Sequence, residues 1–231
     1  VGVYASAARL YDAALMLPTV AAIMVMPLLA RQFQAEREKF SHTLQITMRF
    51  ALGIGLTVAL GVAALAEPVI ELLYKPELAA AAPALRWLIL GAVLMTLDQL
   101  LSSTMLAAEA QHQDLITMAV AVGTLLLCFV LLVPWLGATG AALAVPLSLL
   151  ARVGWRLRWA AGALGLTQLP LALARLAGAG LCGAAGLMLG LQWHAAAALV
   201  LALIGYAVGL RLLGVVSNHP LRQWQQWRAE A

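Results

Sequence analysis

The sequence predicts an all-α membrane protein, a polytopic helical bundle of about seven transmembrane helices. Hydrophobic residues make up 64% of the 231 residues and charged residues only 10%, which leaves too little polar surface to cover a water-soluble globule. Seven apolar stretches are long enough to cross a bilayer as helices, which takes about 20 residues each. They are residues 3–30, 50–73, 85–107, 115–133, 136–155, 171–191 and 195–213.

Two polar connections separate the first three stretches, and each contains a short helical pattern. After the first stretch, Phe40, Leu44 and Met48 recur every four residues, which suits an amphipathic helix on the membrane surface. At the end of the second, the segment VIELLY between Pro68 and Pro76 is too short to span and predicts a short interfacial helix. Both segments could equally be ordinary connectors.

The later stretches follow one another closely. Only PWLG, residues 134–137, separates the fourth from the fifth, so we predict a tight turn there. The fifth contains Pro146, which transmembrane helices tolerate when neighbouring helices satisfy the freed carbonyl. The sixth has Gly186 and Gly190 at GxxxG spacing, which favours close helix packing. We divide the chain into a core of about five spans, residues 1–163, and two further transmembrane helices with a tail, residues 164–231.

Basic residues give an orientation. They gather in residues 31–49, 152–158 and 211–228, and seven spans place these three segments on one side of the membrane. Because basic residues are retained in the cytoplasm, the C-terminus is expected to be cytoplasmic and the N-terminus outside. A start outside without a methionine or a signal peptide predicts the C-terminal part of a larger transporter. A trimmed half-size protein is the alternative.

Among the ionisable residues inside the predicted spans, Arg9, Asp12, Asp98 and Arg175 are the candidates for a site. Arg9 and Asp12 are three apart, so they share a helix face and can pair. Asp98 lies near the middle of the third span, and Arg175 about a turn inside the sixth. Such residues usually face a bundle interior or a wet cavity and mark a substrate path. Arg9 and Arg175 could instead snorkel to an interface.

Polar residues surround Asp98. Gln99 follows it directly, and Ser102 lies four residues on, so a polar stripe runs down one face of the third span. Such a stripe can also hold helices together by hydrogen bonds. Because Asp98 is too short to snorkel from mid-span, we favour a role in substrate binding for this face.

Motifs for other functions are not found. The sequence has no GxxxxGK[ST] phosphate loop, no HExxH and no GxSxG. Cys128 and Cys182 sit singly in apolar runs, and the histidines are scattered. The basic residues flank spans and do not form a nucleic-acid patch. We therefore expect no enzyme activity, no cofactor, no metal and no nucleic-acid partner.

The opening VGVYASAARLYDAALMLPTVAAIMVMPLLAR resembles the characteristic segment of the polysaccharide and lipid-linked oligosaccharide flippases. EPVIELLYKPELAAAAPALRWL is similar to the connector PxIxLLYGxxYxxAxPxLRxL of that family, with Lys75 and Leu78 as departures, and GATGAALA is similar to its later turn and helix. Together these cover about residues 1–159. We identify the chain as resembling the C-terminal part of a Wzx-type O-antigen flippase of the multidrug/oligosaccharidyl-lipid/polysaccharide exporter superfamily.

The resemblance implies two pseudo-symmetric bundles of 12–14 spans in all, which enclose a cavity with basic walls. The implied substrate is a polyprenyl-diphosphate-linked oligosaccharide, moved across the bacterial inner membrane by alternating access for lipopolysaccharide or other cell-surface polysaccharide. The implied partners are that lipid-linked oligosaccharide, membrane lipids and a coupling cation or proton. The expected substrate-binding residues are Arg9, Asp12, Asp98, Gln99 and Arg175.

Three alternatives stay open at this point. A cation-coupled drug exporter of the same superfamily would have a cavity with acidic walls. A membrane-embedded glycan-assembly enzyme would need a large external loop with catalytic groups. A scaffold without transport activity would tolerate apolar residues in place of Arg9 and Asp98.

Overall fold

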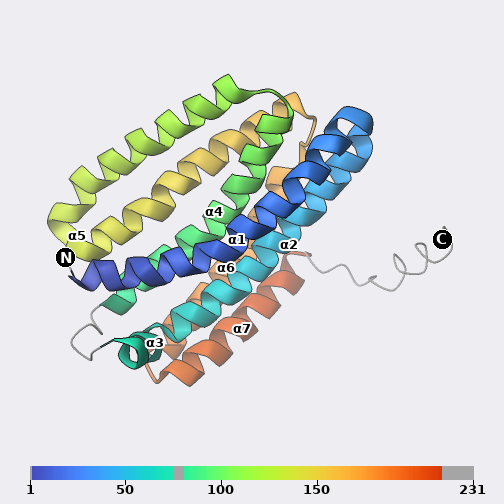
Figure 1. Ribbon diagram of the computed structural model, residues 1–231. Helices are drawn as coiled ribbons and strands as arrows, with labels where there is room; N and C mark the ends of the chain where they lie inside the picture. The colour runs from blue at the N-terminus through green and yellow to red at the C-terminus, as the bar shows by residue number, and fades with distance from the viewer. Residues whose placement is uncertain (1, 75–80, 215–231) are drawn as a thin grey trace.

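The structure is a computed structural model that describes residues 2–74 and 81–214, and every regular element in these ranges is an α-helix. Figure 1 shows the long helices side by side in one bundle, with the α5 hairpin at one edge and α7 at the opposite edge. The predicted departures at Lys75 and Leu78 and the basic tail after residue 214 lie outside the described residues. The helices are α1 (Gly2–Ala35), α2 (Arg37–Ala64), α3 (Ala66–Leu73), α4 (Ala82–Ala107), α5 (Gln111–Ala163), α6 (Gln168–Gly190) and α7 (Ala195–Leu212).

The predicted fold class is confirmed. Among the described residues, five helices are long and apolar enough to cross a membrane, namely α2 from Lys39 onward, α4, α5, α6 and α7. One of them, α5, contains two of the predicted spans, and the first predicted span lies within α1, which has 34 residues. The chain is therefore a polytopic helical membrane protein.

The continuous run of α5 is a hairpin of two arms. A straight helix of its 53 residues would be about 80 Å long, far more than a bilayer needs. Gly137 breaks it with φ 55° and ψ −128°, a left-handed conformation that favours glycine. The arms then approach so closely that a Cβ on Gly140 would lie 2.5 Å from the carbonyl oxygen of Leu132. The tight turn predicted at residues 134–137 is confirmed (Figure 1).

The second span is shifted from its predicted position. α2 begins at Arg37 and ends at Ala64, where the predicted span was residues 50–73. The apolar face of Phe40, Leu44 and Met48 is buried in the main core and does not lie on a membrane surface, so this segment continues the span. The residues after Leu65 form the separate short helix α3, as the prolines predicted.

Helix α4 lies at the centre of the fold. It packs against α1, α2, α3 and α5, and residues along its whole length are buried. The face of Ile89, Val93, Leu97 and Leu100 joins the main core with α2 and α6. A polar residue on α4 is therefore buried among neighbouring helices, except where those helices do not cover it.

Helices α6 and α7 pack with their backbones almost in contact. A Cβ on Gly205 of α7 would lie 2.5 Å from the carbonyl oxygen of Cys182 on α6, and one on Gly209 would lie 2.8 Å from Cα of Ala179. Gly186 and Gly190 of α6, the predicted GxxxG pair, face the backbone of α7 with equally little room. The glycines are packing residues that let the two helices touch.

Replacing Gly205 by alanine is expected to destabilise the protein by about 1–3 kcal/mol, because the added methyl group must push α7 away from α6. Thermal unfolding of the purified protein in detergent measures this. The matched control is Gly123→Ala on the first arm of α5, where no atom lies within 4 Å of the added Cβ. Equal midpoints for the two variants would show that the close approach of α6 and α7 contributes nothing.

Candidate functional site

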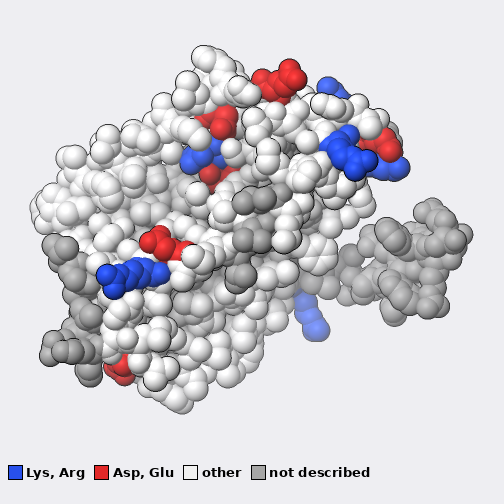
Figure 2. Space-filling view, in the orientation of Figure 1, with Lys and Arg blue, Asp and Glu red and all other residues white. Residues whose placement is uncertain are grey.

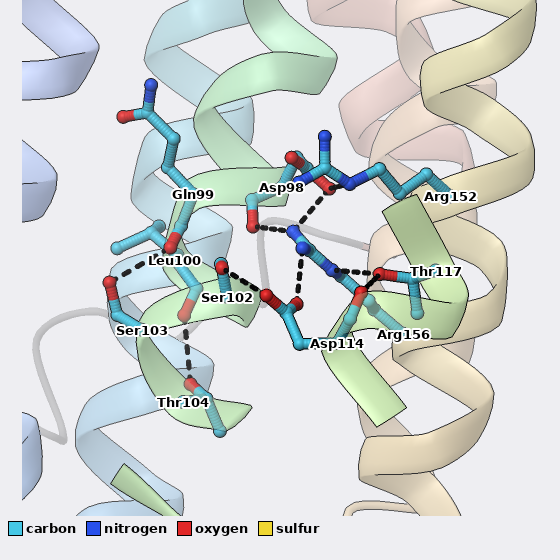
Figure 3. Close-up of polar contacts among 10 residues, drawn as sticks. All are labelled: Asp98, Gln99, Leu100, Ser102, Ser103, Thr104, Asp114, Thr117, Arg152 and Arg156. Atoms are coloured by element: carbon cyan, nitrogen blue, oxygen red, sulfur yellow. Dashed lines mark hydrogen bonds and ion pairs between the residues drawn. The ribbon is translucent and has the colours of Figure 1, made fainter. Parts of the chain in front are cut away.

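Four charged residues form a cluster where α4 meets both arms of α5. Asp98 comes from α4, Asp114 from the first turn of α5, and Arg152 and Arg156 from its second arm. Figure 3 shows the arginine side chains pointing from α5 toward the two carboxylates. Arg152 and Arg156 are four residues apart and so share one face of the helix. We call these residues the charged cluster.

Arg156 is the centre of the cluster and is completely buried, with 0% of its side chain exposed. Its Nη1 donates to the Asp98 carboxylate at 2.6 Å and to the Asp98 backbone carbonyl at 2.7 Å. Its Nη2 donates to the Asp114 carboxylate, and its Nε donates to the Thr117 hydroxyl at 3.1 Å. All three guanidinium nitrogens are thus used, and one side chain joins α4 to both arms of α5.

The hydroxyl groups around Arg156 complete the network. Thr117 donates its own proton to the Asp114 backbone carbonyl at 2.7 Å, so its oxygen is left to accept from Arg156. Ser102, four residues after Asp98 on α4, donates to the Asp114 carboxylate at 3.4 Å. The predicted polar stripe on α4 therefore serves an ion-pair network that reaches a neighbouring helix.

Arg152 is held differently from Arg156. Its Nε lies 3.2 Å from the Asp98 carboxylate, and 16% of its side chain is exposed. The N–H is not aimed along this line, because the buried Nε has no hydrogen-bond partner among the described residues. Arg152 is attracted to Asp98 by charge alone.

Burial explains why the cluster contains equal numbers of acids and bases. An isolated charge in a low-dielectric interior loses several kcal/mol of hydration, and this loss is offset only when opposite charges and hydrogen bonds surround it. Two carboxylates face two guanidinium groups here. Removal of Arg156 would therefore leave two carboxylates without the partner that they share.

Gln99 points away from the cluster, toward α1. Its Nε2 donates to the Thr19 hydroxyl at 3.1 Å, and Thr19 donates in turn to the Leu15 carbonyl at 2.8 Å. Because Thr19 uses its proton in this way, it must accept from the amide nitrogen of Gln99, which fixes the orientation of the amide. The Gln99 Oε1 is then a buried acceptor without a hydrogen-bond partner among the described residues.

The other predicted site residues lie apart from the charged cluster. Arg9 and Asp12 are both exposed on α1, and the ion pairs of the described residues do not join them. Arg175 is exposed on α6. Figure 2 shows charged atoms over the first half of α1 and, on the same face, in a hollow beside the α5 hairpin, both surrounded by uncharged residues.

Sequence reasoning found Asp98 but not its partners. We favoured a role in substrate binding for Asp98, with hydrogen bonds between helices as the alternative, and the structure pairs its carboxylate with two arginines. Arg152 and Arg156 were interpreted only as membrane flanks, and their ion pairs with Asp98 and Asp114 were not foreseen. The usable signal was their spacing of four, since an acid in mid-span needs a base that reaches it from a neighbouring helix.

Comparison with known proteins places the chain in a family of membrane transporters. The model of the family described as Lipid II flippase MurJ matches residues 1–208, while no curated protein matches the chain. The match confirms the resemblance to flippases of lipid-linked precursors, but it does not support the narrower prediction of an O-antigen flippase. Because the model covers most of the sequence, the chain belongs to the lipid II flippase MurJ family.

Proposed function

We propose that this chain carries part of the transport path for a polyprenyl-diphosphate-linked glycan, with lipid II as the substrate. Lipid II, after which the matched family is named, belongs to the substrate class that the sequence resemblance implies. The transport proceeds by alternating access across the bacterial inner membrane, with the C-terminus in the cytoplasm. Cell-wall precursor takes the place of the O-antigen that the sequence comparison first suggested.

The observation that carries the proposal is the exposure of Arg9 and Asp12 on α1 of an apolar bundle. Charges in contact with hydrocarbon are costly, and in membrane proteins they face a bundle interior or a water-filled cavity. The side of α1 that bears them is therefore turned away from lipid. We propose that this side lines the central cavity and that a second helical bundle closes it.

Arg9 is the residue proposed to contact the diphosphate. A guanidinium group offers a planar fork of donors that matches two phosphate oxygens, and such charge-assisted bonds are about twice as strong as neutral ones. In the structure the Arg9 side chain is exposed and forms no ion pair with a described acid. It is therefore free to bind an anion, and Asp12 beside it could accept from a sugar hydroxyl.

The other predicted substrate contacts are Gln99, Arg175 and Asp98. Gln99 has a buried carbonyl oxygen without a hydrogen-bond partner among the described residues, which a sugar hydroxyl would reach only after the neighbouring helix moved. Arg175 stays a prediction for a second contact near the membrane surface. Asp98 is engaged by Arg156, so we propose that it holds the arginines in place. If a cation or proton is coupled to transport through Asp98, the carboxylate must first leave Arg156.

A transport assay tests the proposal. The full-length protein is reconstituted in liposomes with fluorescent lipid II in the inner leaflet, and an added quencher that cannot cross the membrane reports its arrival in the outer leaflet. We expect faster loss of fluorescence than in protein-free liposomes, and no acceleration for a fluorescent phosphatidylcholine of similar size. Equal rates with and without protein would refute transport of this substrate.

A further inference from the structure

We propose that Arg152 is a second anion-binding residue of the transport path, which binds the phosphate groups of a lipid-linked substrate at a depth different from that of Arg9. The inference rests on the proposed function and adds a binding residue to it. It is carried by a difference between the two arginines of the charged cluster: one is fully used by the protein and the other is not.

Arg152 and Arg156 differ in their hydrogen bonds. Every guanidinium nitrogen of Arg156 donates to a protein oxygen, and the side chain has no exposure. Arg152 donates no hydrogen bond to any described residue, although its Nε is buried. This Nε is covered and faces Asp98, so the donors that a ligand can reach are those of Nη1 and Nη2. An acceptor from outside the chain would satisfy the remaining donors of Arg152.

The position of Arg152 allows a ligand to reach it. Its side chain is 16% exposed, and that of Asp114 in the same cluster is 20% exposed, whereas Asp98 and Arg156 are sealed. In Figure 2 acidic and basic atoms are visible in the hollow beside the α5 hairpin, on the face where α1 bears its charges. Arg152 and Asp114 are therefore the members of the charged cluster that a ligand can reach.

The charges around Arg152 define what it binds. The cluster has two acids and two arginines, so an anion is not drawn in by net charge. Asp98 instead holds the Nε side of the Arg152 guanidinium at 3.2 Å, which leaves the Nη side for a ligand. A planar fork with free donors is suited to two oxygens of one phosphate or diphosphate, so geometry and not charge alone gives the affinity.

The two arginines lie at different depths. Arg9 is seven residues after the start of α1, or about 10 Å along the helix axis. Arg152 is fifteen residues after the break at Gly137, or about 22 Å along the second arm of α5. α1 and the second arm of α5 start at the same end of the bundle (Figure 1). A head group that crosses the membrane would thus meet Arg9 and Arg152 in succession.

Binding by the full-length protein in nanodiscs tests the role of Arg152. Three probes are compared: a polyprenyl diphosphate without sugar, the uncharged polyprenol, and phosphatidylglycerol. Arg152→Gln is expected to weaken binding of the diphosphate roughly tenfold to a hundredfold, the loss typical of charge-assisted hydrogen bonds, and to leave polyprenol binding unchanged. Arg152→Lys keeps the charge but not the fork and is expected to lose most of the same affinity. Arg158→Gln, an exposed arginine of the same helix, is the matched control.

The outcomes separate this inference from the proposed function. Wild-type affinity for the diphosphate in both Arg152 variants would overturn the inference, whatever lipid II transport shows. A loss confined to the diphosphate supports a substrate site, whereas an equal loss for phosphatidylglycerol assigns the same anion site to bulk lipid. Thermal unfolding is measured in parallel. If Arg152→Gln lowers the midpoint of thermal unfolding, the diphosphate affinity of Arg152→Lys decides the question. Wild-type affinity in Arg152→Lys would show that the planar guanidinium group is not needed for binding.

Discussion

Replacing Arg156 by glutamine is expected to destabilise the bundle by about 3–5 kcal/mol, the cost of breaking a buried ion pair by removing one partner. Arg156 is completely buried and binds two carboxylates, so its loss leaves Asp98 with Arg152 alone and Asp114 without an ion-pair partner among the described residues. Glutamine is shorter and neutral and cannot reach both acids. Thermal or denaturant unfolding of the purified protein measures the effect, together with the amount of protein in the membrane.

Arg158 provides the matched control for this prediction. It lies two residues further along the same helix and is exposed, so Arg158→Gln is expected to change the free energy of unfolding by less than about 0.5 kcal/mol. Similar shifts for Arg156→Gln and Arg158→Gln would show that the charged cluster does not hold α4 to α5.

A double-mutant cycle locates the energy in the pair. Asp98→Asn alone leaves Arg156 with one acid, and Arg156→Gln alone leaves Asp98 unpaired. In the double variant neither buried charge of the pair remains, so the combined cost is expected to be smaller than the sum of the two single costs. Additive costs would indicate that each residue acts through other neighbours.

The sequence predicts most of the fold because hydropathy and turn residues determine it. The tight turn at residues 134–137 is visible as Pro-Trp-Leu-Gly between two apolar runs, and Gly137 adopts a conformation that favours glycine. The boundaries of α2 are less predictable. Its first turns carry Arg37 and Lys39, which lower the hydropathy of the window, and only tertiary packing shows that Phe40, Leu44 and Met48 belong to the core.

The charged cluster shows why part of the site could not be predicted. In the sequence, Arg152 and Arg156 stand in a run of basic and aromatic residues at the end of an apolar stretch, which is also the pattern of a membrane flank. Asp98 and Arg156 are 58 residues apart. Their pairing depends on which helix packs beside α4, and hydropathy and residue spacing do not reveal that.

The charged cluster and the exposed pair Arg9 and Asp12 on α1 have different roles. The charged cluster is mostly satisfied by its own residues and stabilises the contact of α4 with α5. Arg9 and Asp12 form no ion pair with the part of the chain that the structure describes and remain exposed on α1. Changes at Arg156, Asp98 or Asp114 should therefore lower the amount of folded protein, whereas changes at Arg9 or Asp12 should lower transport alone.

Arg9→Ala is accordingly expected to abolish transport of lipid II while the protein accumulates in the membrane at its normal level. The exposed side chain contributes little to packing, so its removal should not unfold α1, but the diphosphate would lose the guanidinium that offsets its charge in an apolar path. The liposome quenching assay measures transport, and immunoblots of membranes measure the amount of protein.

Two further variants decide how Arg9 acts. Arg31→Ala removes another exposed arginine from the last turns of the same helix and should leave transport intact, because that end of α1 lies far from Arg9. Arg9→Lys keeps the positive charge without the planar fork, so partial transport would indicate that charge alone matters and complete loss would indicate bidentate binding. Full transport by Arg9→Ala would remove α1 from the substrate path, because no other arginine of that helix lies within its first half.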